Sequence, residues 1–476
     1  MNIAPNKTKI VCTIGPVSES RQIMERMLLS GMNVARLNFS HGDFSGHAQV
    51  IGNLRDAAAA TGRRLAILAD LPGPKMRIGQ LEPEPIDLRP GEFFTLTSDN
   101  IVGNSSRVSV SFPQLPSAVR PGNTLFLNDG LIQLEAVSVE GNNVRCRIVV
   151  GGELRSRKGL NLPGIDLGIS SFTEHDFKCM KFALENGVDA VSQSFVNRAS
   201  DIEEVRSAAA GLGYHPFIIA KIERSTALYH IEEILDTADS IMIARGDLGV
   251  EAPIEEIPVI QKRLTRLANM RGKPVITATQ MLESMTGNSR PTRAEATDVA
   301  NAILDGTDCV MLSAESAMGS YPVESTAMLA RIAASIEPHR QALTVGEMFK
   351  ESGLKGKIRP EHLIALGVES CLEYVTPAAV FIPTRSGSTA RRISSFHLPV
   401  WIFAISSQMA TCQQLQFTSG VFPIHESEHP EDWNSYTRQW VAQNGLSGDL
   451  VILTEGPSNR HPDANHRMEI INLHRV

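Results

Sequence analysis

The chain has 476 residues, and its 52 acidic against 45 basic residues give a formal net charge of -7. Its length exceeds one ordinary hydrophobic core, so we expect two to four domains, and 42% hydrophobic with 20% charged residues excludes a disordered protein. The negative balance argues against a general surface for nucleic acid or an anionic membrane, although a local basic pocket for phosphates stays open.

Short apolar strands alternate with helical stretches from the N-terminus onward. The strands are rich in Val, Ile and Ala, as expected for parallel strands buried on both faces. They are expected at 9–15, 33–40, 65–71, 189–195, 215–222, 240–247, 274–280 and 309–315. Thr173-x-x-Asp176 and Ser200-x-x-Glu203 have capping-box spacing before two of the helices. This order also allows a doubly wound sheet, but eight β–α pairs favour a (β/α)₈ TIM barrel over residues 1–71 and 167–340.

The alternation breaks once, over residues 72–166, where turn residues recur at short intervals. Five short strands fit between the turns, at 93–97, 107–111, 124–127, 133–139 and 144–150. Such spacing predicts a small β-barrel or sandwich inserted in the third loop of the barrel. An insert at that position can act as a lid over the C-terminal face, where barrel active sites lie.

A separate region follows, over residues 341–476. Strands are expected at 378–384, 400–405, 421–425, 449–453 and 468–473, with helices between most of them. This pattern predicts a compact C-terminal α/β domain.

The cysteines and the N-terminus favour a reducing compartment. The six cysteines are scattered without a Cys-x-x-Cys pair, so we expect small buried hydrophobes. The first residues lack the apolar core of a signal peptide, and no run reaches membrane-spanning length. We therefore expect a cytoplasmic protein.

Polar residues stand at the C-terminal ends of six predicted strands, and a barrel gathers these ends around one pit. Lys221 and Glu223 lie two residues apart and so share one face of a strand. The other ends carry Arg36 with Asn38 and Ser40, Asp70, Asp247, Thr279 with Gln280, and Glu315. Each residue taken singly is more often structural. Burying so many charges costs several kcal/mol each unless they are paired or bind a ligand, which favours a common site.

The residue types at these ends indicate phosphoryl chemistry. Glu223 and Asp247, without zinc-type partners, suit a hard divalent cation whose remaining ligands are substrate oxygens and water. Arg36 is able to grip phosphate or carboxylate through two parallel hydrogen bonds. No Walker-type phosphate loop is present. The residues therefore predict a metal-dependent enzyme acting on a small anionic, phosphorylated substrate.

Six ordered motifs resemble those of the pyruvate kinase family from end to end. They are TKIVCTIGP at 8–16, ARLNFSHG at 35–42, KGLNLPG at 158–164, ARGDLGVE at 244–251, ATQMLESM at 278–285 and PTRAE at 291–295. The resemblance implies a barrel with an inserted B domain and a C domain. It also implies phosphoryl transfer from phosphoenolpyruvate to ADP, giving pyruvate and ATP, with Mg²⁺ or in its place Mn²⁺, in a homotetramer.

The resemblance also implies roles for single residues. Arg36 would bind the phosphate of phosphoenolpyruvate, and Lys221 would stabilise the phosphoryl group in flight. Glu223 and Asp247 would hold Mg²⁺, while Thr279 would stand where the enolate is protonated, directly or through a water. The further residues implied in binding substrate, nucleotide or the phosphoryl group are Asn38, His41, Arg77, Lys158 and Gly246.

One departure from the family pattern concerns K⁺. Many members bind K⁺ at positions that match Asn38, Ser40, Asp70 and the backbone at Leu71, and carry glutamate where this chain has Lys75. In members with lysine there, the ammonium stands in for the ion. We expect activity without added K⁺, the alternative being that Lys75 only faces solvent. Milder departures at Thr226, Ala227, Ala314 and Ser316 remove no ligand.

A loop of the C-terminal region resembles the family's sugar-phosphate effector loop. It comprises Thr384, Arg385, Ser386, Gly387, Ser388 and Thr389, before a helical run. Amides and hydroxyls at a helix start form a phosphate cradle, so we expect a phosphorylated effector, with plain N-capping as the alternative. The neighbouring His397-Leu398-Pro399 lacks the arginine that the family often has before this proline, and the loop 456–465 is unlike common versions.

Two other functions stay open on the residues alone. A barrel lyase or aldolase acting on phosphoenolpyruvate or pyruvate also uses Mg²⁺ and an arginine, although it needs no lid for a nucleotide. A catalytically silent metabolite sensor would retain the fold, but need not keep the metal pair together with Lys221.

Overall fold

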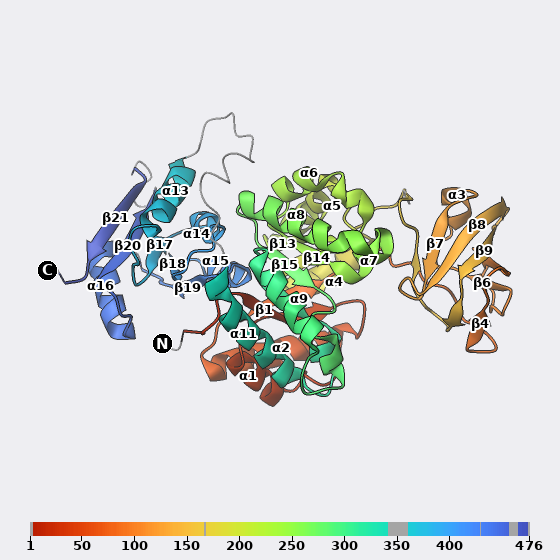
Figure 1. Cartoon of the computed structure of the whole chain (residues 1–476), viewed down its shortest axis with the longest axis horizontal. Helices are drawn as coiled ribbons and strands as arrows, with labels where there is room; N and C mark the ends of the chain where they lie inside the picture. The colour runs from red at the N-terminus through yellow and green to blue at the C-terminus, as the bar shows by residue number, and fades with distance from the viewer. Residues whose placement is uncertain (1–2, 166–167, 341–359, 429, 457–464, 475–476) are drawn as a thin grey trace.

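The computed structural model describes residues 3–165, 168–340, 360–428, 430–456 and 465–474. The boundaries expected near 166 and 341, and most of the loop 456–465, lie outside these residues. Three bodies follow one another along the long axis in Figure 1. A β-rich lobe lies at one end, the barrel in the middle and the C-terminal α/β body at the other end.

The central body is a closed barrel of eight parallel strands. Its strands are β1 (Lys9–Thr13), β2 (Met32–Asn38), β3 (Ala66–Asp70), β12 (Ala190–Gln193), β13 (Phe217–Ile222), β14 (Ser240–Ala244), β15 (Val275–Ala278) and β16 (Cys309–Leu312). Because β1 pairs with both β2 and β16, the sheet closes, which confirms the barrel and excludes the doubly wound alternative.

Helices cover the outside of the barrel. They are α1 (Arg21–Leu29), α2 (Phe44–Thr61), α4 (Glu174–Glu185), α5 (Ala199–Gly211), α6 (Ile231–Thr237), α8 (Ile257–Met270), α9 (Arg293–Leu304) and α11 (Pro322–Ile336). Short helical turns fill the loops, namely η1 (Ser225–Leu228), α7 (Arg245–Glu251), η2 (Ile254–Glu256), η3 (Glu283–Thr286), α10 (Ala314–Ala317) and η4 (Glu337–His339). The strand expected over 240–247 is therefore wrong beyond Ala244, because the chain turns directly into α7.

The capping signals have mixed outcomes. Thr173 caps α4 through a capping box with Asp176, as expected. At α5 the expectation fails, because Ser200 lies inside the helix. Asp201 instead accepts the backbone N–H groups of Asn197 and Arg198.

Apolar side chains fill the barrel interior and also seal one of its ends. The interior cluster includes Val11, Leu68 and Met242, all buried. Phe417, from the C-terminal body, joins it and stacks on Phe217 with ring centroids 5.3 Å apart. Phe217 begins β13, so this contact lies at the N-terminal end of the strands, opposite their carboxyl ends.

The β-rich lobe lies between β3 and α4 in the chain. It contains β4 (Ile86–Leu88), β5 (Phe93–Thr97), β6 (Arg107–Ser109), α3 (Leu115–Ala118), β7 (Thr124–Leu127), β8 (Ile132–Glu140), β9 (Asn143–Val150), β10 (Gly152–Leu154) and β11 (Leu160–Asn161). Six strands form one sheet in the order β11-β7-β8-β9-β5-β6. Isolated bridges join Arg77 to Gly159 and Ile78 to Val110, so the segment after β3 links the two sheet edges in the manner of a small barrel.

The C-terminal body is a five-stranded sheet with helices. Its elements are α13 (Pro360–Leu372), β17 (Val380–Pro383), α14 (Ser388–Ser394), β18 (Ile402–Ser406), α15 (Met409–Gln414), η5 (Leu415–Phe417), β19 (Val421–His425), α16 (Trp433–Asn444), β20 (Leu450–Glu455) and β21 (Arg467–Asn472). The order is β19-β18-β17-β20-β21, with β21 antiparallel to β20. The expected α/β architecture is confirmed.

Two expected features concern cysteines and membranes. All six cysteines are free, and five are buried. Within the described ranges, no helix combines the length and apolar character needed to cross a membrane.

Candidate active site

Lys221 lies at the centre of a buried charge cluster at the carboxyl ends of the barrel strands. Its Nζ is 2.7 Å from Oε1 of Glu223 and 3.3 Å from Oδ1 of Asp70, and it donates a 2.7 Å hydrogen bond to Oγ of Ser194. Burial alone would lower the pKa of Lys221, but Asp70 and Glu223 outweigh it and raise that pKa. The ammonium is therefore charged and fixed in place.

Asp70 joins Lys221 to Arg36. Its Oδ2 accepts Nε of Arg36 at 2.8 Å and Nη2 as well, while its Oδ1 accepts Oγ of Ser192 at 2.7 Å. Burial opposes ionisation, yet Lys221 and Arg36 hold the pKa of Asp70 well below its usual range. Arg36 also donates to Oγ1 of Thr13 at 2.9 Å, which turns one edge of the guanidinium to the barrel wall.

Two carboxylates at the mouth, those of Glu223 and Asp247, are the candidate metal ligands. Glu223 accepts the backbone N–H of Phe195 at 2.8 Å on the oxygen that does not contact Lys221. Asp247, in the first turn of α7, keeps an exposed face and accepts no hydrogen bond from any described residue. Desolvation by the surrounding protein is the main cause that raises the pKa of the Asp247 carboxyl to about 6, and the charge of Glu223 is the second.

This donor set fits Mg²⁺. Lys221 offsets the charge of Glu223, whereas no described hydrogen bond or ion pair offsets that of Asp247. A divalent cation beside both carboxylates would offset the remaining charge. The described residues hold no group of three or more His, Cys, Asp or Glu side chains that would suit a metal. A divalent cation held by two carboxylates would take its remaining ligands from water or substrate, as Mg²⁺ commonly does.

Thr279 is held in a strained conformation at the end of β15. Its φ is +68°, although it is β-branched, and the next residue, Gln280, has φ +53°. Its Oγ1 accepts the backbone N–H of Gly246 at 2.8 Å, and its carbonyl oxygen accepts Nη2 of Arg245 at 2.7 Å. Such strain persists only where the surroundings enforce it, and it concentrates at functional sites.

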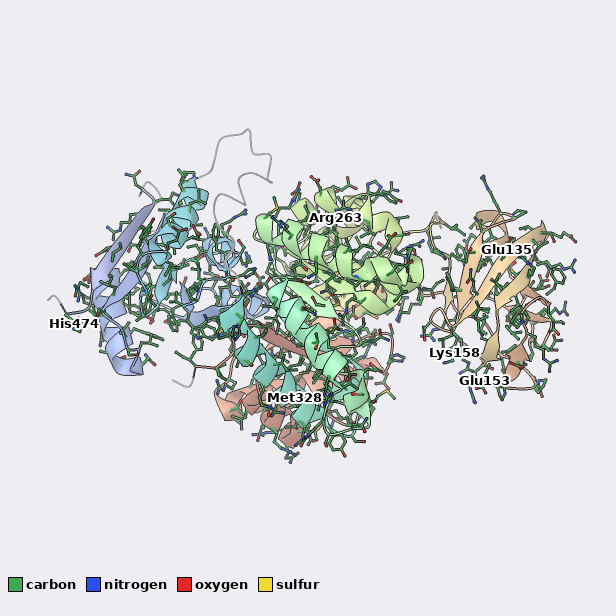
Figure 2. All side chains as sticks on the ribbon, in the orientation of Figure 1. Glu135, Glu153, Lys158, Arg263, Met328 and His474 are labelled. Carbon is green, nitrogen blue, oxygen red and sulfur yellow. The ribbon has the colours of Figure 1, made fainter. Side chains whose placement is uncertain are left out.

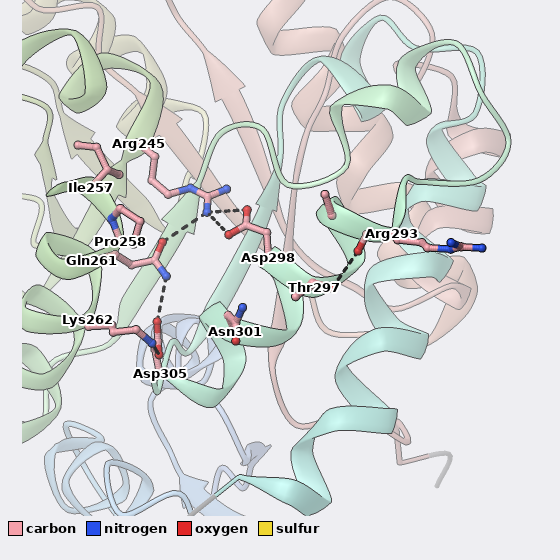
Figure 3. Close-up of a pocket in the computed structure, with 11 residues that line it drawn as sticks. Arg245, Ile257, Pro258, Gln261, Lys262, Arg293, Thr297, Asp298, Asn301 and Asp305 are labelled. Carbon is pink, nitrogen blue, oxygen red and sulfur yellow. Dashed lines mark hydrogen bonds and ion pairs between the residues drawn. The ribbon is translucent and has the colours of Figure 1, made fainter. Parts of the chain in front are cut away.

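Arg245 links this turn to a cavity behind it. Figure 3 shows its guanidinium between Gln261 and Asp298, with Nη1 2.7 Å from Oδ2 of Asp298. The cavity measures about 580 Å³ and is lined mainly by α8 and α9. Neither Lys221 nor the carboxylate pair lines it, so it is not the reaction site.

Lys75 and Arg77 lie on the chain that leaves β3 for the lobe, and His41 lies in the loop after β2. Lys75 is exposed, and no ion pair is formed by its ammonium among the described residues. Desolvation and the charge of Lys221 lower the pKa of Lys75, while the charges of Glu223, Asp247 and Asp70 oppose this shift. Partial burial and the charges of Lys75, Arg77 and Arg36 lower the pKa of His41. Arg77 itself donates to the carbonyl of Arg157 at 3.0 Å.

Lys158 lies apart from this cluster. Figure 2 shows it in the β-rich lobe, at the edge nearer the barrel, and no described contact joins it to the barrel residues above. Its backbone carbonyl accepts the N–H of Ile78 at 2.9 Å, which is a contact within the lobe.

The residues expected around a monovalent ion lie at the ends of β2 and β3. Asn38 pairs in register with Asp70, and its Oδ1 accepts the backbone N–H of Ser40 at 3.1 Å. The carbonyl of Leu71 accepts Oγ of Ser194 at 2.7 Å. Oδ1 of Asn38 and the carbonyl oxygen of Leu71 therefore already accept hydrogen bonds from the protein.

Three hydroxyl residues of the site were missed in the sequence. Ser192 and Ser194 contact Asp70, Lys221 and the carbonyl of Leu71, and Thr13 contacts Arg36. The available signal was their place at the ends of the fourth and first strands, which predicts a position at the barrel mouth. Serine and threonine are common at such positions and do not by themselves indicate a site.

The expected effector loop leads into α14, with Gly387 as its N-cap residue at φ +76°. Thr384 Oγ1 accepts the N–H of Gly387 at 3.0 Å, and Arg391 donates to the carbonyl of Ser386 at 2.8 Å. Thr411 Oγ1 donates to the carbonyl of Arg385 at 2.7 Å. Hydrogen bonds within the loop and from Arg391 and Thr411 therefore hold its backbone in place.

Comparisons with known proteins agree with this geometry. The family model "Pyruvate kinase, barrel domain" matches residues 5–326, and "Pyruvate kinase, alpha/beta domain" matches residues 362–471. A pyruvate kinase of Thermococcus litoralis is 44% identical over 461 residues, covering 96% of each chain. One from Geobacillus stearothermophilus is 42% identical over 94% of this chain and 77% of the relative.

A solved structure shares the whole fold. The crystal structure of a pyruvate kinase from Cryptosporidium parvum superposes with a TM-score of 0.91 at 33% identity. The match covers 98% of this chain and 96% of that one. The relatives named are phosphotransferases of a generally Mg²⁺-dependent family, and the chain belongs to the pyruvate kinase family.

Proposed function

We propose that this chain transfers the phosphoryl group of phosphoenolpyruvate to ADP at the cluster around Lys221. The observation that carries the proposal is the buried contact of Lys221 with both Asp70 and Glu223, beside Arg36. Phosphoryl transfer requires mainly positioning and neutralisation of charge, and this cluster is built for both.

The residues divide the task between them. Arg36 binds the phosphate of phosphoenolpyruvate, and Lys221 stabilises the phosphoryl group as it moves, with Arg77 on the side of the insert. Glu223 and Asp247 hold Mg²⁺, or Mn²⁺ in its place, which supplies a Lewis acid for the substrate's carboxylate and phosphoryl oxygens. Thr279 stands at the position where the enolate receives its proton.

Further substrate contacts complete the proposed site. Asn38, His41, Gly246 and Lys158 bind substrate or nucleotide, and Lys158 contributes only when the lobe lies over the barrel mouth. Lys75 takes the place of K⁺ beside Asn38, Ser40, Asp70 and the backbone at Leu71. The effector loop at 384–389 binds a phosphorylated metabolite, and the chain forms a homotetramer.

The proposed domains keep their expected limits. They are a catalytic barrel over 1–71 and 167–340, an inserted lid over 72–166 and a C-terminal domain over 341–476.

One coupled assay tests the function. With phosphoenolpyruvate, ADP and Mg²⁺ present, pyruvate and ATP form in equal amounts. A barrel lyase would consume phosphoenolpyruvate without ADP, and a silent sensor would show no turnover; either result contradicts the proposal.

A further inference from the structure

Arg224 follows Glu223 directly and contacts three parts of the molecule. Its side chain is only 4% exposed. Its Nη2 donates to the carbonyl of Ile165 at 2.8 Å and to that of Leu162 at 3.4 Å, on the chain that returns from the insert. Its Nε lies 3.8 Å from Oε2 of the buried Glu251, the last residue of α7. One guanidinium thus joins the insert's return segment to the end of β13 and to the helix that carries Asp247.

A cavity of about 320 Å³ borders this contact. Pro74 lines it from the outgoing chain crossing, and Ile165 and Gly168 line it from the returning one. The buried Oγ of Ser171, which also lines it, and Nε of Arg224 have no hydrogen-bond partner in the described part of the chain. A solvent-accessible hollow, not packed side chains, therefore borders Arg224 on this side. The hydrogen bonds of Arg224 thus restrain the return segment where few side chains pack against it.

We propose that Arg224 is a positioning residue that sets where the insert lies relative to the barrel mouth. Figure 1 shows the lobe to the side of the barrel. Two chain crossings join it to the barrel, and Gly130 of the lobe lies close to Val250 of α7. Holding the return crossing against Glu223 and α7 fixes the angle at which the lobe leaves the barrel. The alternative is that these hydrogen bonds only offset the cost of burying the guanidinium. In that case removing Arg224 would lower the stability of the protein without moving the lobe. The consequence for catalysis rests on the proposed function, because Arg77 and Lys158 travel with the lobe.

A distance measurement tests the clamp without relying on activity. Spin labels are placed at Glu153→Cys in the lobe and Arg263→Cys on α8, both exposed and labelled in Figure 2. The background is Cys371→Ser, since the other five cysteines are buried, and labelled chain is diluted with unlabelled chain so that distances within one chain are read. The intact protein should give a narrow distribution, and Arg224→Met a broader or shifted one. An unchanged distribution would overturn the proposal.

The matched control is Arg198→Met. Arg198 is exposed and lines the same cavity, but its side chain donates no hydrogen bond to the return crossing among the described residues. We expect its distance distribution to match that of the intact protein. A change as large as that of Arg224→Met would show that any loss of charge at the cavity moves the lobe, and would contradict a specific clamp.

Kinetics separate positioning from damage to the metal ligand beside it. Arg224→Met should lower kcat/KM for ADP by about 10- to 100-fold, because misplacement by about 1 Å has effects of that size. Mn²⁺ affinity, measured without substrates, should change less than twofold, and Arg224→Lys should recover part of the loss. Parallel losses of Mn²⁺ affinity and turnover would refute a positioning role. If the intact chain shows no kinase turnover, the proposed function fails, while the spin-label result still decides the clamp.

Discussion

Gly246 donates its backbone N–H to Oγ1 of Thr279 at 2.8 Å, across the gap between the ends of two neighbouring barrel strands. The same hydroxyl donates to the carbonyl of Ala278 at 2.6 Å, and the backbone stays at φ +68°. Strain of this kind costs about 1–3 kcal/mol, so the surroundings must enforce it. The bond therefore fixes one hydroxyl group at the barrel mouth before any substrate arrives.

Removing that hydroxyl should slow the reaction without unfolding the protein. Thr279→Ala is expected to lower kcat by about 10²-fold or more, the usual contribution of a positioned proton-transfer group. Thr279→Ser keeps the hydroxyl and should retain most of the activity. Steady-state turnover in the coupled assay checks this. Similar losses in both variants would point to the methyl group and the backbone, not to the hydroxyl.

Lys221→Met should abolish most of the turnover and also destabilise the barrel. The loss of a cation from the transferring group is expected to reduce kcat by about 10³-fold or more. Asp70 and Glu223 would remain buried without their shared partner, and breaking a buried ion pair in this way costs about 3–5 kcal/mol. Turnover and the urea midpoint of unfolding measure the two effects.

Lys178→Met is the control for Lys221→Met. Lys178 pairs with Glu174 on the exposed surface of α4, where ion pairs contribute little. Both turnover and unfolding should stay close to those of the intact protein. If Lys221→Met behaved the same way, neither the catalytic nor the structural role of Lys221 would hold.

Much of the site was predictable because barrels place strand ends together. Lys221 and Glu223 share a face by strand periodicity, and the closed barrel brings them next to Asp70 and Arg36. The contacts of Ser192 and Ser194 were not predictable, since they depend on the register between β3 and β12. The separation of Lys158 from the barrel depends on how the lobe lies, which no local pattern encodes.

Lys75 should make the enzyme independent of K⁺. The charges of Glu223, Asp247 and Asp70 act on its ammonium, and negative charge of this kind would otherwise favour a monovalent cation. We expect equal velocity in Na⁺ and K⁺ for the intact protein, and a many-fold K⁺ stimulation for Lys75→Glu. Velocities at constant ionic strength measure this. A many-fold rise in K⁺ for the intact protein would exclude the substitution of ion by ammonium.

A phosphorylated metabolite should activate the enzyme through the loop before α14. Activation curves with fructose bisphosphate, glucose 6-phosphate, ribose 5-phosphate and AMP identify it. Ser388→Glu should abolish the response by placing a negative charge where phosphate binds. Ser447→Glu, on an exposed turn after α16, should leave the response intact. A flat response to all four compounds would leave Gly387 and its neighbours with a capping role only.

Metal affinity should fall as the pH drops below about 6. The surrounding protein and Glu223 raise the pKa of Asp247 to about 6, and a carboxylate must lose its proton before it binds a cation. Protons therefore compete with the metal below that pH, by about tenfold in apparent affinity per pH unit once Asp247 is mostly protonated. Mn²⁺ titrations without substrates between pH 5 and pH 8 measure the effect. Asp247→Asn should bind weakly with little pH dependence over this range, whereas equally steep curves for both proteins would place the titrating group elsewhere.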